Sequence, residues 1–211
     1  MIILYRLSKY TELTAALIQA YIRDNAKNQT RQKKLYNYYK GNHAINQREM
    51  ADESKPNNKI SNPYAHYITD IMTGYFMGEP VSYTSNNDEL LEVIKAIYNY
   101  NDEAANNSEL AQDASIYGVA YELLYLDSDS EIRFKHIDTE GSFPIYEDDL
   151  EADLLYFIRT YKNTNILTNY TTTFVEVYSR YDIKYYELGE AELKLTGEMP
   201  HSWGLVPVCI Y

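Results

Sequence analysis

Residues 57–83 read NNKISNPYAHYITDIMTGYFMGEPVSY, and this stretch predicts one helix with a signal at each end. Asn62 is placed to cap the first turn, and Pro63 suits the first helical position, where its missing N–H removes no hydrogen bond. Gly78 is placed to end the helix in a left-handed conformation, and Pro80 prevents the helix from continuing. We therefore expect a helix that begins at Asn62 and ends at Gly78.

The same helix carries one apolar face. Its large side chains recur at steps of three and four residues, and they are Tyr64, Tyr67, Ile68, Ile71, Met72 and Tyr75. This spacing is typical of a helix that packs one side into a hydrophobic core. We therefore expect the helix to be buried and to hold the fold together as a scaffold, without contributing a catalytic group.

The rest of the chain divides into three parts. Residues 1–41 are predicted to form a helical N-terminal arm, residues 42–58 a polar linker, and residues 59–211 an α+β domain. In that domain we expect helices up to about residue 118 and strands from about residue 121, where the hydrophobic period changes to two. The fold class is thus α+β, with a helical N-terminal half followed by a mainly antiparallel β-sheet region.

Local signals place the individual elements. Thr11 is placed to cap a helix and Gly41 to end one, with an apolar helical stripe at 13–22 and a second helical stretch at 30–40. Further helices are expected to start at 86–88, with apolar residues up to 97, and near residue 108, running through 117. Strands are predicted where apolar and polar side chains alternate or where β-branched and aromatic residues are frequent. These segments are 81–84, 121–126, 131–137, 154–161, 172–178, 183–188 and 192–195.

The net charge of −12 is unevenly distributed. Residues 1–59 contain eleven Lys/Arg and five Asp/Glu, a balance of +6, whereas the other 152 residues carry eight basic and 26 acidic side chains, a balance of −18. A domain that grips nucleic acid usually has a basic face, so the acidic bulk argues against that role. The 24 tyrosines suit half-buried positions and protein–protein surfaces, and a tyrosine-rich core is an equally good interpretation.

Four cations interleave with tyrosines near the end of the basic segment, and they are Arg31, Lys33, Lys34 and Lys40. Cations alternating with aromatic rings are found in single-stranded nucleic-acid sites, but they also occur on a solvated helix face above a tyrosine core. A third interpretation is a docking patch for the acidic surface of a neighbouring subunit. We favour this third interpretation over DNA binding because the acidic bulk of a second copy would complement the patch.

No motif predicts catalysis or a cofactor. Asp127, Asp129 and Glu131 have the spacing that opens a calcium loop, but Ile132 stands where such a loop needs glycine, so residues 127–130 are interpreted as a hairpin turn. The acidic run at 147–153 reads as a solvated loop, with a metal site as the alternative. We expect a non-enzymatic protein without cofactor or metal.

The single cysteine, Cys209, excludes an intrachain disulfide and is expected to be buried in its apolar run. No apolar stretch approaches the roughly 20 residues that a membrane-spanning helix needs. The N-terminus lacks the pattern of a signal peptide. These features favour a cytoplasmic location without membrane contact.

Four stretches, in order, resemble the portal (head–tail connector) proteins of tailed bacteriophages of the long-tailed siphophage type. The second of them combines NKISNPY at 58–64 with GYFMGEPV at 74–81. LYNYYKG at 35–41 precedes it, and DASIYGVAYELL at 113–124 and HSWGLVPVCIY at 201–211 follow. By this resemblance the chain corresponds to the N-terminal, wing-like part of a portal protein.

The resemblance implies a structural role in a virion, with assembly in the host bacterial cytoplasm. It implies a ring of about a dozen subunits at one capsid vertex, served by terminase, capsid and head-completion proteins, through which DNA passes without specific binding. Family members run to roughly twice this length, so the resemblance implies that the stem, clip and crown are missing from this chain, and we expect this chain alone to be monomeric or weakly associating. The family also tends to place proline where Thr139 stands.

Two other functions remain open at this stage. One is a general virion or prophage protein-interaction module. The other is a nucleic-acid-binding accessory protein that uses the basic N-terminal arm.

Overall fold

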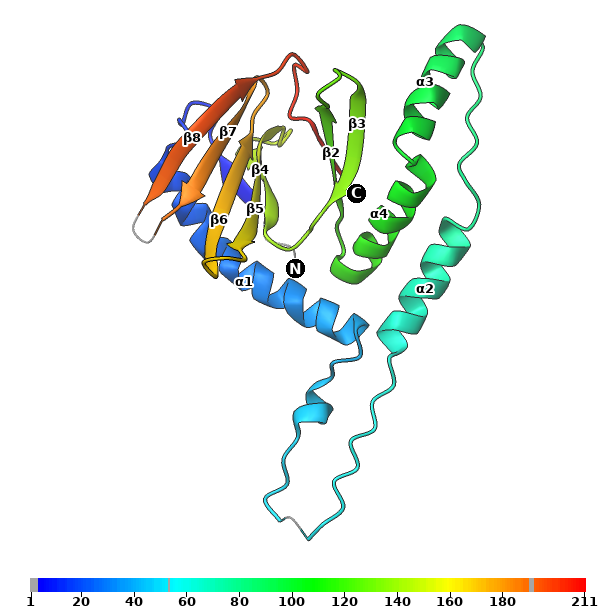
Figure 1. The fold of residues 1–211 in the computed structure, drawn as a ribbon, viewed down its shortest axis with the longest axis vertical. Coiled ribbons are helices and arrows are strands. Elements are labelled where there is room, and N and C mark those ends of the chain that lie inside the picture. Colours follow the sequence, from blue (N-terminus) through cyan, green and yellow to red (C-terminus); the bar gives the residue numbers. More distant parts are fainter. Residues whose placement is uncertain (1–3, 53, 190–191) are drawn as a thin grey trace. The chain divides into compact units, whose positions relative to one another are not determined.

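The computed structural model describes residues 4–52, 54–189 and 192–211 (Figure 1). Helices dominate its first half and mostly antiparallel strands its second, so the predicted α+β class is confirmed. The chain forms two compact units. We call Met1–Thr30 with Asp138–Cys209 the sheet unit, and Arg31–Ile137 with Ile210–Tyr211 the helical unit.

These units differ from the arm, linker and domain that we expected. The 25-residue helix α1 (Ala15–Tyr39) is continuous where two helices were predicted, and the boundary between the units falls inside it. It continues because the sequence has no Gly or Pro between Thr11 and Lys40. Thr14, rather than Thr11, caps its first turn, since the Thr14 Oγ1 accepts a hydrogen bond of 3.3 Å from a backbone N–H.

The sheet unit contains a six-stranded sheet in the order β1-β4-β5-β6-β7-β8. Its strands are β1 (Tyr5–Leu7), β4 (Ser142–Glu147), β5 (Leu154–Asn165), β6 (Tyr170–Tyr178), β7 (Asp182–Leu188) and β8 (Leu193–Pro200). Only the β1–β4 pair is parallel; the other pairs are antiparallel. Ile18 of α1 packs into the core of this sheet with Phe143, Ile145 and Ile158.

The sequence missed two strands of this sheet. Strand β1 has only three residues and lies in the arm that was expected to be helical, and β4 contains Pro144. A three-residue strand carries too little alternation to be recognised, and proline is rare inside strands. The expected strands at 154–161, 172–178, 183–188 and 192–195 are all present, although their observed bounds are longer.

Besides the end of α1, the described part of the helical unit contains three further α-helices and a hairpin. These are α2 (Tyr64–Phe76), α3 (Asp88–Tyr100), α4 (Glu103–Tyr117), β2 (Tyr121–Leu126) and β3 (Ile132–Ile137), and a 3₁₀ helix spans Ala44–Gln47. Strand β9 (Val208–Ile210) completes a second sheet in the order β3-β2-β9. The predicted hairpin is confirmed, whereas α4 starts earlier than residue 108 and the strand expected at 81–84 is not formed.

The end signals of α2 were interpreted incorrectly. Pro63 precedes the helix without a side-chain cap, and Asn62 contributes only its carbonyl, which accepts a hydrogen bond of 2.8 Å from the Tyr64 N–H. Gly78 lies beyond the helix and does not adopt the left-handed conformation. It is needed for a different reason, since a Cβ there would lie 2.2 Å from the carbonyl oxygen of Gly74.

The larger correction concerns burial. Every residue of the predicted core face of α2 is at least half exposed, and within α2 only Thr69 is buried. The helix is present where it was predicted, but its apolar face is not part of a core of this chain. Cys209 is likewise exposed rather than buried.

The helices that the structure describes include none that is both long and apolar enough to cross a membrane.

Candidate interaction surfaces

Helix α2 packs on α4 through its small side chains. Thr69 Oγ1 lies 3.1 Å from Ser115 Oγ on α4, and Ala65 and Thr73 are partly buried on the same side of α2. Residues 65, 69 and 73 are spaced by four, so they form a single stripe along the helix. This stripe, and not the predicted apolar face, is the side of α2 that packs against its own chain.

A polar cluster fixes the start of α2 against the end of α1. The Tyr39 hydroxyl accepts a hydrogen bond of 2.7 Å from Gln112 Nε2 and donates one of 3.4 Å to Asp70 Oδ1. Asp70 Oδ2 lies 3.1 Å from His66 Nε2, and the His66 ring is 4.7 Å from that of Tyr39. Burial, followed by the Asp70 carboxylate, raises the pKa of Tyr39. His66 and Asp70 are the only ionisable residues of α2 besides its tyrosines, and both are engaged in this cluster.

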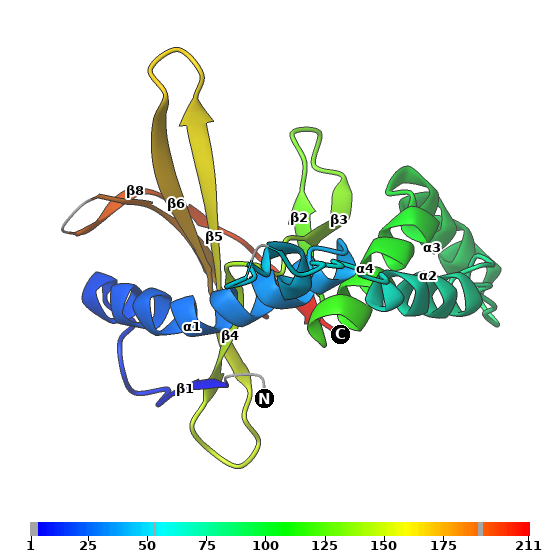
Figure 2. The same cartoon turned by 90° about the horizontal axis from the view of Figure 1, so that it is seen from below.

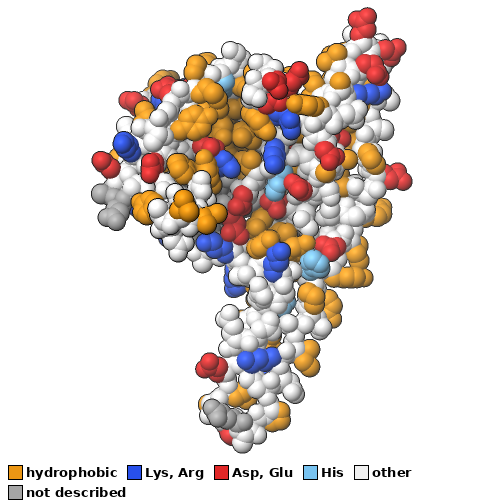
Figure 3. All heavy atoms as spheres, in the orientation of Figure 1, with side chains coloured by type: hydrophobic (Ala, Val, Ile, Leu, Met, Phe, Trp, Pro, Cys, Tyr) orange, Lys and Arg blue, Asp and Glu red, His pale blue; other side chains and the backbone are white. Residues whose placement is uncertain are grey.

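Seven large apolar side chains of α2 lie outside this stripe, and each is between 50% and 90% exposed. We call them the α2 face: Tyr64, Tyr67, Ile68, Ile71, Met72, Tyr75 and Phe76. Figure 3 shows hydrophobic side chains over the part of the surface where α2 runs in Figure 1. The predicted scaffold residues are therefore brought together by the structure, but as a surface.

A second exposed apolar surface lies in the sheet unit, at the turn between β5 and β6. Ile166 and Leu167 are 93% and 96% exposed, and Tyr170 follows at 65%. Figure 2 shows β5 and β6 extending beyond the other strands of their sheet. Residues 163–173 contain no charged side chain. We call Ile166, Leu167 and Tyr170 the hairpin tip; sequence analysis did not single it out.

The four predicted patch residues lie at the end of α1 and just beyond it. Arg31, Lys33, Lys34 and Lys40 are all exposed, and none forms an ion pair with a residue in the described part of the chain. The ring of Tyr36 stacks 6.1 Å from Tyr39 and 6.2 Å from Tyr117. Two of the tyrosines that alternate with the cations, Tyr36 and Tyr39, thus stack on rings of the helical unit itself.

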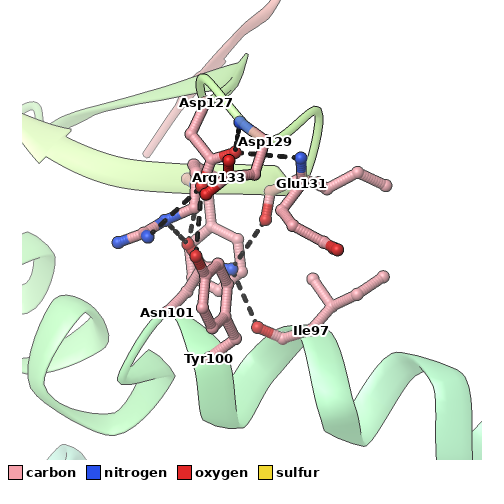
Figure 4. A network of polar contacts seen from close by, with 9 residues as sticks. Ile97, Tyr100, Asn101, Asp127, Asp129, Glu131 and Arg133 are labelled. Atoms are coloured by element: carbon pink, nitrogen blue, oxygen red, sulfur yellow. Dashed lines mark hydrogen bonds and ion pairs between the residues drawn. The ribbon is translucent and has the colours of Figure 1, made fainter.

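The corner between α3 and α4 is joined to the β2–β3 hairpin by one amide (Figure 4). Asn101 Nδ2 donates to the carbonyls of Ile97 and Ile132, at 2.8 and 3.0 Å. Its Oδ1 accepts from Arg133 Nε at 2.9 Å and from the Phe134 N–H at 3.1 Å. This side chain therefore connects the last turn of α3 to strand β3.

Asp127 organises the hairpin turn that was predicted at residues 127–130. Its Oδ1 accepts hydrogen bonds of 3.0 Å from the backbone N–H groups of Asp129 and Glu131. These bonds, the one to Glu131 foremost, hold the pKa of Asp127 below its usual range. Among the described residues, no group of three His, Cys, Asp or Glu side chains could hold a metal ion.

A buried polar network closes the base of the same hairpin. Glu122 accepts hydrogen bonds from Asn106 Nδ2 at 2.6 Å and from the Tyr211 hydroxyl at 2.8 Å. His136 Nε2 lies 2.8 Å from Asp113 Oδ2 on α4. These contacts tie α4 to β2, β3 and the end of the chain, so they are structural.

Comparison with known proteins gives two matches. A protein-family model described as "Phage portal protein, SPP1 Gp6-like" matches residues 18–211. The portal protein of Bacillus phage SPP1 is 28% identical over 173 residues, which cover 76% of this chain and 34% of that protein. The chain thus spans about a third of the length of the curated relative that it matches.

Proposed function

The chain belongs to the SPP1 Gp6-like family of phage portal proteins, whose model matches residues 18–211, and we propose that it is a structural subunit of a portal ring at one vertex of a phage capsid. The family match over almost the whole chain is the observation that carries this proposal. The ring serves DNA packaging and ejection and joins the head to the tail. The protein is a component of the virion and assembles in the bacterial cytoplasm.

Partners follow from this role. Neighbouring portal subunits form a ring of about a dozen copies, and terminase, capsid and head-completion proteins contact that ring. The part of the chain after residue 59 carries a charge of −18, which supports a conduit whose surface repels the phosphates that pass along it. DNA therefore passes without specific binding.

We further propose that Arg31, Lys33, Lys34 and Lys40 contact an acidic surface of an adjacent subunit. Their exposure supports this role, and so does the stacking of Tyr36 within its own unit, which removes a ring from base stacking. Charge reversal at Arg31, Lys33 and Lys34 should weaken association between copies at low salt. If the wild-type chain instead binds DNA tightly at the same salt concentration, and the charge-reversal variant does not, an accessory nucleic-acid-binding role would be favoured.

Immunogold electron microscopy of purified phage particles tests the portal role. We expect an antibody against this chain to label one vertex per capsid, and an antibody against the major shell protein to label the whole surface as the matched control. Label of this chain over the whole shell, or on no particle, would contradict the proposal.

A further inference from the structure

We infer that the α2 face is the surface on which a second copy of this chain docks, and that the hairpin tip of that copy is the part that contacts it. This inference rests on the proposed ring, but it concerns which surfaces of adjacent subunits meet.

The size of the α2 face calls for a protein partner. It contains four aromatic side chains, each of about 150–250 Å² in full, together with Ile68, Ile71 and Met72, all at least half exposed. The face therefore amounts to several hundred Å², comparable to the roughly 800 Å² that each partner contributes to a standard stable interface. Monomeric soluble proteins rarely expose so large a contiguous apolar patch.

The chemistry of the α2 face selects an apolar partner. None of the seven residues of the α2 face carries a charge, and the other ionisable residues of α2, His66 and Asp70, contact each other beside Tyr39. A nucleic acid needs cations, which this face does not offer. Tyrosine and methionine, in contrast, are enriched at protein–protein interfaces.

The chain itself supplies a complementary surface. A ring is built from heterologous contacts, in which two different surfaces of each copy meet. The α2 face belongs to the helical unit and the hairpin tip to the sheet unit, so the two can act as such a pair. The tip is uncharged and presents two adjacent aliphatic side chains that are almost fully exposed. Leu150 is equally exposed, but its neighbours Asp148, Asp149 and Glu151 make that loop a poor match for an apolar face.

Site-specific cross-linking tests this contact directly, and it captures weak association. In a Cys209→Ser background, one protein carries Ile68→Cys and a second, distinguishable by a mass tag, carries Leu167→Cys. The two are mixed and gently oxidised, and the disulfide-linked heterodimer is quantified by mass spectrometry. Because each protein has one cysteine, every linked product is intermolecular. All three substituted positions are exposed, and circular dichroism checks that the fold is kept.

The matched control replaces Leu167→Cys by Leu150→Cys, which is at least as exposed. We expect the 68–167 heterodimer to exceed the 68–150 product at least tenfold, and to fall at least tenfold when Ile71→Asp is added to the first protein. Equal yields of the two products would overturn the inference, and so would predominant 68–68 dimers, which would mean that two α2 faces pack on each other.

The outcome separates this inference from the proposed function. Particles labelled at one vertex without a preferred 68–167 product would leave the portal role intact and refute the contact. A preferred 68–167 product without label on any particle would support the contact and refute the portal role.

Discussion

Thr69 on α2 and Ser115 on α4 share a hydrogen bond of 3.1 Å between their side-chain oxygens, and this contact determines which side of α2 faces its own subunit. The stripe of Ala65, Thr69 and Thr73 lies toward α4, and the tyrosine-rich side points away. An amphipathic helix is thus used with its more polar side inward. The exposed side then becomes available to another molecule.

Substitutions on the α2 face should hardly change the stability of the isolated chain. We expect Ile71→Gln and Tyr75→Gln to change the free energy of unfolding by less than about 0.5 kcal/mol, because these side chains are already exposed. Leu110→Ala on α4, where the side chain is only 4% exposed, should destabilise by about 2–5 kcal/mol. Urea unfolding of the three variants measures this, and a loss above about 2 kcal/mol for Ile71→Gln would mean that the face is a core surface.

Two glycines near the end of α2 should respond oppositely to alanine. A Cβ at Gly74 meets nothing within 4 Å, so Gly74→Ala should stabilise by about 0.5–1 kcal/mol through its better helix propensity. A Cβ at Gly78 would lie 2.2 Å from the Gly74 carbonyl oxygen, so Gly78→Ala should destabilise by about 1–3 kcal/mol. Thermal unfolding midpoints should move in opposite directions; a shift of both in the same direction would refute this explanation.

The side-chain amide of Asn101 should contribute measurably to the stability of the fold. Asn101→Ala removes four side-chain hydrogen bonds, three to strand β3 and one to the Ile97 carbonyl of α3, so we expect a loss of about 1–3 kcal/mol in the free energy of unfolding. The matched control is Asn99→Ala, at an exposed position of the same helix, which should change stability by less than about 0.5 kcal/mol. Indistinguishable urea midpoints for the two variants would contradict this role.

Tyr5 should contribute to the loss of stability at alkaline pH. Its ring packs 5.0 Å from Phe143, and burial, with the Asp24 carboxylate adding to the shift, raises its pKa to about 12. Because the folded-state pKa lies above the unfolded value of about 10, the stabilisation is complete below pH 10 and disappears as pH rises toward 12.

The comparison of wild type with Tyr5→Phe measures this contribution. Plots of the free energy of unfolding against pH should run parallel below about pH 9 and diverge above about pH 10, with the variant shallower by up to one proton. Identical slopes from pH 10 to 12 would show that Tyr5 does not titrate differently in the folded state.

Much of the local structure was predictable because its signals are local. Asn87 caps α3 with a hydrogen bond of 3.1 Å to the Leu90 N–H, and Asp127 marks the turn between β2 and β3. Strand β1 could not be found in this way, since its three residues pair in parallel with β4, far along the chain. Such pairing depends on tertiary contacts that no short window contains.

For the α2 face, the sequence predicted which residues share one side of the helix but not that this side is exposed. The spacing from Tyr64 to Tyr75 correctly identified residues that share one side of a helix, but periodicity does not say what covers that side. A signal for the correct orientation was present in the small residues Ala65, Thr69 and Thr73, which permit close packing on α4. The hairpin tip was missed because an Ile-Leu pair in a turn has no periodic pattern.

The copy number of this protein in purified virions tests the central claim, that the chain is a subunit of a single-vertex portal ring, most directly. Quantitative mass spectrometry with isotope-labelled peptides from this chain and from the major shell protein gives that number per capsid. We expect about a dozen copies, the number that one closed ring accommodates. A copy number close to that of the shell protein, or no detectable copies in intact virions, would contradict it.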